Sequence, residues 1–184
     1  QLRHLNISKI PYEEQPEVLA ALPSLSQLQV LDASQSSLVE IPTQMLQLTE
    51  LKQLNLSDNQ LEFLPQEFQQ LMQLEVIDLS QNSFEQFPPV LFEMKSLQQV
   101  LLANSMMCYA DHDLRLSANI AQLTNLKRLD LSGNWIDSLP PVLDALTNLT
   151  HLDLYSCGIA YDELKVLVTL PNIEDLDIGG GSFD

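Results

Sequence analysis

The sequence predicts an α/β solenoid, in which about eight short parallel strands stack into one sheet and short helical or 3-10 segments return on the opposite side. Three observations predict this fold. One eleven-residue pattern recurs along the chain, successive copies begin 23 to 29 residues apart, and hydrophobic residues make up 45% of the 184 residues. That share of hydrophobic residues is enough for a continuous core running through all the copies.

The repeated pattern is clearest in three segments: LKQLNLSDNQL at 51–61, LEVIDLSQNSF at 74–84 and LKRLDLSGNWI at 126–136. All three follow LxxLxLxxNxL, where isoleucine or phenylalanine can replace leucine. Less regular copies bring the number to eight, with starts near Leu2, Leu28, Leu51, Leu74, Leu97, Leu126, Leu149 and Ile173. A spacing this regular over eight copies indicates an internal structural repeat.

Each copy is typical of a short strand followed by a turn. In LxL a polar residue separates two apolar ones, which is the alternation of a strand with one buried face. The asparagine that follows is suited to hydrogen-bonding unpaired backbone groups inside the turn. We expect a ladder of such residues at Asn59, Asn82 and Asn134, with Cys157 filling the same position as a small buried residue.

The returns after the turns are short. A proline stops the strand in four copies, at Pro42, Pro65, Pro88 and Pro140. Because only about a dozen residues then remain, short 3-10 turns are favoured over full helices.

Two other returns, 12–22 and 160–170, predict true helices. In the first we expect Val18, Leu19 and Leu22 to face inward. In the second we expect Asp162 to cap the helix, with Leu164, Leu167 and Val168 facing inward.

At these residues the chain resembles the leucine-rich repeat family, and the resemblance covers essentially the whole sequence. The return segments IPTQMLQLTE and LPQEFQQLMQ are similar to those of the 23-residue class found in intracellular and bacterial members. The resemblance implies a single horseshoe-shaped domain over residues 1–184, whose concave parallel sheet is the binding surface. Since the chain starts at Gln1 without methionine and ends abruptly, we expect it to be a fragment of a longer protein.

Acidic residues dominate the charge. The chain has 25 Asp and Glu against 8 Lys and Arg, for a net charge of −17. Phosphate backbones and anionic lipid head groups repel such a surface, which argues against nucleic acid and membranes as partners. No apolar run approaches the ~20 residues that a membrane span needs. We therefore expect another protein as the partner, one with a basic surface.

An acidic column is the first candidate site. The residue between the two strand leucines is, in successive copies, Asn6, Asp32, Asn55, Asp78, Leu101, Asp130, Asp153 and Asp177. The column suggests a cation site or a track for a basic peptide; alternatively, it is the residue choice common at this position in leucine-rich repeats. The second interpretation is favoured, because a row of carboxylates without convergent geometry makes no closed metal cage.

Cys108 and His112 are the second candidate, with His151 as an optional third member. The first two side chains would meet if this segment were helical, but a nucleophilic cysteine also needs an oxyanion donor, and no glycine turn of that kind accompanies them. A zinc site made of Cys108, Asp111 and His112 has too few ligands for tetrahedral coordination. We therefore predict a protein that is not an enzyme and that carries no metal and no cofactor.

The third candidate is an insertion at 105–119, in the only copy that runs six residues over the usual length. The strand of the same copy has Leu101 in the acidic column, so an apolar spot interrupts a polar face. We expect Met106, Met107, Tyr109 and His112 to lie near this spot and to contact a partner. The alternative is a helix-forming insertion, DHDLRLSANIAQL, that folds Leu114, Leu116 and Ile120 into the core.

The fourth candidate is a polar and aromatic patch on the last strands, made of Lys127, Arg128, His151 and Tyr155. A partner's carboxylate would dock there, with Tyr155 as an anchor. The alternative is ordinary ion pairing with the aspartates next door. Trp135 occupies a normally polar position after the turn, which suggests a further contact.

Together these features favour a recognition module that binds a partner protein through the concave face and the insertion at 105–119. The alternative is the substrate-recognition arm of a larger enzyme or of a bacterial host-directed effector, for example one linked to a ubiquitin ligase. The expected location is the cytoplasm or, for an effector, the host cell.

Overall fold

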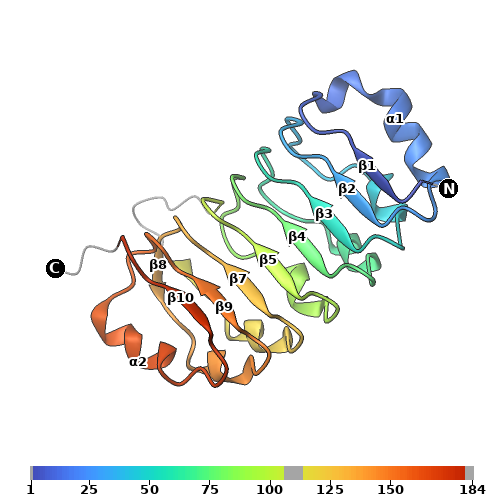
Figure 1. Cartoon of the computed structure of the whole chain (residues 1–184). Coiled ribbons are helices and arrows are strands. Elements are labelled where there is room, and N and C mark those ends of the chain that lie inside the picture. Colours follow the sequence, from blue (N-terminus) through green and yellow to red (C-terminus); the bar gives the residue numbers. More distant parts are fainter. Residues whose placement is uncertain (1, 106–113, 181–184) are drawn as a thin grey trace.

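The computed structural model describes residues 2–105 and 114–180, and it confirms the predicted solenoid. Eight parallel strands form one open sheet in the order β1-β2-β3-β4-β5-β7-β9-β10, so each strand pairs with the strand of the next repeat (Figure 1). The strands are β1 His4–Asn6, β2 Val30–Asp32, β3 Gln53–Asn55, β4 Val76–Asp78, β5 Gln99–Leu101, β7 Arg128–Asp130, β9 His151–Asp153 and β10 Asp175–Asp177. All eight begin two residues after the predicted start of their repeat.

The register of the sheet aligns equivalent residues of every repeat. The first strand position forms one column: His4, Val30, Gln53, Val76, Gln99, Arg128, His151 and Asp175. The third position forms the acidic column, and the apolar middle position between them points into the core in every strand but β10, where Leu176 is exposed. We call the surface made by the first and third positions the sheet face.

The core lies between the sheet and the returns. The described apolar residues of the pattern are buried in the six inner repeats, whereas Leu2 and Leu176 of the end repeats are 47% and 37% exposed. Phe68 and Phe84 are also buried, and each loses about 150–250 Å² of exposed area on folding. The returns are the 3-10 segments Tyr12–Glu14, Leu22–Ser24, Met45–Gln47, Gln66–Gln70, Pro89–Glu93, Ala118–Gln122, Pro141–Ala145 and Tyr161–Glu163. The short length of each return explains why 3-10 turns replace helices.

The two predicted helices are present but shorter than expected: α1 is Pro16–Ala21 and α2 is Leu164–Leu167. In α1, Leu19 is buried and Val18 is exposed. The expected cap of α2 is wrong, since the helix starts after Glu163, and Asp162 belongs to the preceding 3-10 turn. Val168 was also expected to be buried and is 83% exposed, because a helix of one turn ends before it.

The turn after each strand requires a left-handed backbone. The residue just before the ladder position has φ between +50° and +72° in all eight repeats, at Lys9, Gln35, Asp58, Gln81, Asn104, Gly133, Ser156 and Gly180. Only two of these eight are glycine. A non-glycine residue in this conformation costs about 1–2 kcal/mol, which the hydrogen bonds of the turn must offset.

Candidate interaction surface

The polar ladder ties each turn to the neighbouring repeat. The Asn59 amide donates to the carbonyl oxygens of Ala33 at 3.0 Å and Leu56 at 2.8 Å. Its Oδ1 accepts the N–H groups of Ser36 and Leu38, each at 3.0 Å. All four partners belong to backbone inside the turns, so this side chain satisfies groups that the strand pairing leaves unpaired.

Asn82 and Asn134 have equivalent roles. Asn82 donates to Leu56 and Leu79 at 3.0 and 2.9 Å, and Asn134 donates to Leu102 and Leu131 at 2.8 and 2.7 Å. Both side chains are buried. They therefore hold the backbone together and do not face a ligand.

Cys157 fills the ladder position with a single donor. Its Sγ–H points to the carbonyl of Leu131 at 3.0 Å, much as the hydroxyl of Ser105 donates to Leu79 at 2.6 Å. Burial raises the pKa of the Cys157 thiol to about 12, so it stays protonated at neutral pH. A buried, protonated thiol is a structural group and not a nucleophile.

The acidic column serves the backbone of its own repeats. In seven of the eight repeats the Oδ1 of the column residue accepts the N–H two residues further on, at 2.9–3.0 Å. In four of these repeats, at Asn6, Asp32, Asn55 and Asp130, the serine hydroxyl at that position also donates to the same Oδ1 at 2.7 Å. These local bonds account for Asp and Asn in the column without any ligand.

Leu101 is the exception, and its neighbours adjust to it. It pairs in register between Asp78 and Asp130 and is half-buried. Leucine cannot accept the N–H of Ala103, which donates instead to the hydroxyl of Ser80 in the preceding repeat, at 3.2 Å. The acceptor that Leu101 lacks is thus replaced by the Ser80 hydroxyl, through a hydrogen bond that joins two repeats.

The insertion is described at Ser105 and from Leu114 onward. Met106, Met107, Cys108, Tyr109, Asp111 and His112 lie outside the described residues. Beyond them, Leu114–Arg115 forms strand β6, which pairs in parallel with β8, Ile136–Ser138, in a separate two-stranded sheet. A helix over 111–123 is therefore wrong for residues 114–116, because the turn of the next repeat offers them a strand partner. Leu116 and Ile120 are buried, as the alternative expected.

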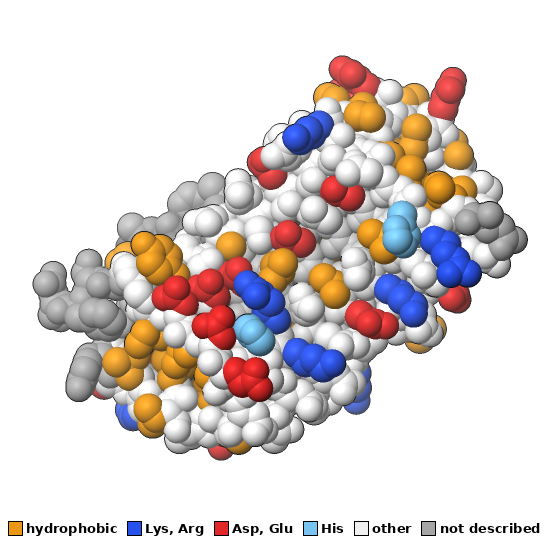
Figure 2. All heavy atoms as spheres, viewed as in Figure 1, with side chains coloured by type: hydrophobic (Ala, Val, Ile, Leu, Met, Phe, Trp, Pro, Cys, Tyr) orange, Lys and Arg blue, Asp and Glu red, His pale blue; other side chains and the backbone are white. Residues whose placement is uncertain are grey.

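The predicted patch divides into two parts. Arg128 and His151 are register partners on β7 and β9, and they line a hollow of about 90 Å³ together with Asp153, Asp175 and Asp177. Acidic, basic and histidine side chains gather over these strands (Figure 2). Burial raises the pKa of Asp153, and the charges of Asp130 and Asp177 raise it further.

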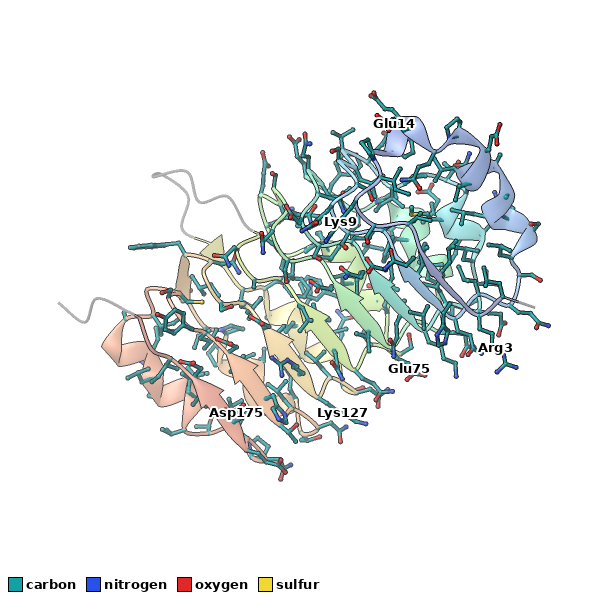
Figure 3. The ribbon with its side chains drawn as sticks, turned by 45° about the horizontal axis from the view of Figure 1, so that its top comes forward. Arg3, Lys9, Glu14, Glu75, Lys127 and Asp175 are labelled. Atoms are coloured by element: carbon teal, nitrogen blue, oxygen red, sulfur yellow. The ribbon has the colours of Figure 1, made fainter. Side chains whose placement is uncertain are left out.

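Lys127 belongs to a different arrangement. Its Nζ donates to Oε1 of Gln98 at 2.9 Å, and the Gln98 amide donates to Glu75 at 3.3 Å. The labelled Lys127 and Glu75 lie along one edge of the sheet, with Lys9 at the opposite edge (Figure 3). Sequence reasoning missed this three-residue row, although all three occupy the second position of the repeat.

Tyr155 and Trp135 are both exposed, at 51% and 62%. Tyr155 lies beside Gly179, where an added Cβ would be 3.3 Å from its ring. The ring of Trp135 lies over Gly158, whose added Cβ would be 3.5 Å away. Each ring therefore rests on a glycine of a neighbouring turn, with its outer face accessible.

A second asparagine ladder was also missed. Asn125, Asn148 and Asn172 each donate to a backbone carbonyl of the preceding repeat, at 2.7–2.8 Å. Each is the last residue before the start of the following repeat, and that recurring position was the available signal.

Two further features bear on function. Among the described residues, no three His, Cys, Asp or Glu side chains come together to hold a metal ion. No helix in the same part of the chain has the length and apolar character needed to cross a bilayer.

Comparison with known families identifies the class of protein. A family model described as "Leucine rich repeat" matches residues 26–84, and a second, "Leucine Rich repeats (2 copies)", matches residues 124–167. Together the two matches span more than half of the chain. The chain belongs to the leucine-rich repeat family. No curated protein sequence matches it.

Solved structures extend the likeness to nearly the whole chain. A leucine-rich repeat protein of Leptospira interrogans is 30% identical, with a TM-score of 0.84 over 99% of this chain and 44% of that one. The Arabidopsis receptor kinase HAESA, solved with the peptide hormone IDA and the co-receptor SERK1, is 25% identical, with a TM-score of 0.74 over 99% of this chain and 29% of that one.

An internalin of Listeria monocytogenes shares the fold, at 20% identity and a TM-score of 0.65, over 89% of this chain and 51% of that one. The chain thus spans about half the length of these proteins or less.

Proposed function

We propose that this chain is a non-enzymatic recognition module that binds a partner protein through the sheet face around Leu101 and the insertion at 105–119. The observation that carries the proposal is the exception at Leu101. Seven repeats keep a hydrogen-bonding side chain in this column, and the eighth has an apolar one in the same repeat that carries the extra residues.

The environment of Leu101 supports a contact. Exposed apolar area within a polar surface is a common mark of a protein interface. In this proposal Met106, Met107, Tyr109 and His112 add contacts from the insertion. Arg128, His151 and Tyr155 supply a second, polar contact that begins on the adjacent strand β7, with Lys127 and Trp135 at its margins.

The similar solved proteins are consistent with this assignment. HAESA, 25% identical, was solved in complex with a peptide hormone and a co-receptor. Leucine-rich repeat proteins generally mediate protein–protein interaction. A partner with a basic surface fits the net charge of −17.

The test is capture of a partner from native lysate with the whole chain, followed by titration of variants. Leu101→Asp and Tyr109→Ala should each weaken binding by about 1–3 kcal/mol if these residues anchor the interface. Asn55→Asp is the matched control, since it adds the same charge to the same column on β3, two strands from Leu101. If both test variants bind as tightly as the parent, the insertion is structural, and Arg128→Ala and Tyr155→Ala become the variants to titrate.

A second candidate is the recognition arm of a larger enzyme or bacterial effector. The observation behind it is that the similar solved proteins are longer than this chain, which covers 44% of the Leptospira protein. The full-length reading frame tests it: a catalytic domain beside these repeats supports this role, and its absence contradicts it.

A further inference from the structure

A second exposed apolar surface surrounds Phe63, away from the sheet face. Phe63 lies in the segment between the asparagine turn of its repeat and the 3-10 return, directly before Leu64 and Pro65. Its side chain is 58% exposed. The equivalent residues of the two neighbouring repeats are Glu40 and Gln86, so an aromatic ring replaces a polar side chain at this position.

Hollows flank the ring on both sides. The larger, of about 510 Å³, has apolar walls from Tyr12, Ile41, Pro42, Leu46 and Pro65. The smaller, of about 220 Å³, has walls from Leu64, Phe84, Pro88 and Pro89. Phe63 lines both. We call Phe63 and these two hollows the Phe63 groove.

The walls of the groove are built on rigid backbone. Two prolines line each hollow, and proline fixes its own φ and restricts the residue before it. Leu46, Leu64 and Phe84 are buried and held by the core. A preformed surface loses little conformational entropy when a ligand binds, which favours affinity.

The charge of the groove has one sign. Glu40 and Glu67 line the larger hollow, and Glu62 and Glu85 line the smaller one. No Lys, Arg or His lines either hollow. Anionic lipids and a second copy of this acidic chain are therefore repelled, whereas a cationic segment is attracted.

We propose that the Phe63 groove binds an extended segment of a partner protein in which two apolar side chains, two positions apart, are flanked by Lys or Arg. Alternate side chains of an extended chain point the same way and lie about 6.5–7 Å apart, which lets one enter each hollow on either side of the ring. The flanking cations then meet the four glutamates. This surface is distinct from the sheet face, so both can be occupied together.

The probe is a randomised library of displayed dodecapeptides selected on the immobilised whole chain, with the enriched peptides resynthesised and titrated. Phe63→Ser should weaken their binding about tenfold or more, as expected for an aromatic anchor. Val39→Ser is the matched control, because Val39 is 59% exposed and lines neither hollow. That variant should bind within about twofold of the parent. Urea midpoints equal to that of the parent for both variants exclude a folding defect.

A second arm tests the charge. The pair Glu40→Gln and Glu67→Gln should weaken binding and reduce its salt dependence, whereas Glu50→Gln, outside the groove, should change neither. Enriched peptides should carry Lys or Arg beside their apolar residues.

The proposal is overturned if no peptide is enriched, if the enriched peptides are acidic, or if Phe63→Ser binds them as the parent does. Peptides that lose affinity through Leu101→Asp but not through Phe63→Ser occupy the sheet face, which supports the proposed function and overturns the groove. A dimer in sedimentation that Phe63→Ser dissociates makes a second copy the occupant, and likewise overturns it.

Discussion

The hydroxyl of Ser80 accepts the backbone N–H of Ala103 at 3.2 Å, a bond that joins the fourth repeat to the fifth. In the other repeats the equivalent N–H donates to the side chain of the column residue two positions earlier. Leu101 has no acceptor atom in its side chain. The contribution of Ser80 to the stability of the fold therefore depends on which residue stands at position 101.

This coupling gives the first prediction. Ser80→Ala in the parent should cost about 1–3 kcal/mol of unfolding free energy, since it leaves the N–H of Ala103 without its acceptor. In a Leu101→Asp background the new carboxylate accepts that N–H, and the same serine change should cost well under half as much. A double-mutant cycle in urea measures the difference, and additive effects would contradict the coupling.

The second prediction concerns the ladder. Asn82→Ala should lower the unfolding free energy by about 1–3 kcal/mol, because it strips partners from buried backbone carbonyls and from the N–H of Leu61. Gln60→Ala should have an effect near zero, as Gln60 is exposed. Equal urea midpoints for the two variants would show that the assigned roles are wrong.

The third prediction concerns the left-handed position. Gly133→Ala should destabilise the fold, because φ is +67° and an added Cβ would lie 2.1 Å from Oδ1 of Asn104. Gln81→Gly, at the same position with φ +56°, should be neutral or stabilising, since glycine adopts this conformation without strain. The melting temperature should fall for Gly133→Ala and should stay the same or rise for Gln81→Gly, as measured by thermal melts. A harmless Gly133→Ala would rule out the close approach.

The fourth prediction concerns Cys157 and alkaline pH. The thiol has a pKa raised from 9.0 to about 12 in the folded chain, so the folded state holds its proton more tightly than the unfolded state. Its contribution to stability is complete below pH 9 and is lost as pH rises toward 12. Cys157→Ser should remove this pH dependence and retain a donor to Leu131. Urea melts at a series of alkaline pH values measure it.

Thiol labelling provides an independent check on the same residue. Cys157 is 1% exposed, so native-state modification should be slow and should accelerate only on unfolding. Rapid labelling of Cys157 in the native state would be incompatible with its place in the ladder.

The sequence by itself determined the eight strands, their parallel order and the residues of the ladder. A repeat of about 23 residues with a fixed apolar pattern can bury its apolar face only by stacking on copies of itself. Once that pattern is aligned, Asn59, Asn82 and Asn134 must follow their strands at equivalent points, because register transfers from one repeat to the next. The same logic placed Leu101 in the acidic column.

Only the tertiary structure decided which side chains meet between repeats. Lys127 and Arg128 are neighbours in sequence, yet one bonds to Gln98 at the sheet edge and the other lines a hollow with His151, because Lys127 stands just before β7 and Arg128 is its first residue. Leu114–Arg115 became a strand because Ile136–Ser138 offers a backbone partner, which local helix propensity does not reveal. The Phe63 groove is likewise formed by returns of consecutive repeats, whose paths the apolar pattern does not specify. Periodicity encodes contacts that recur in every repeat, whereas contacts that occur once depend on the packing of the whole chain.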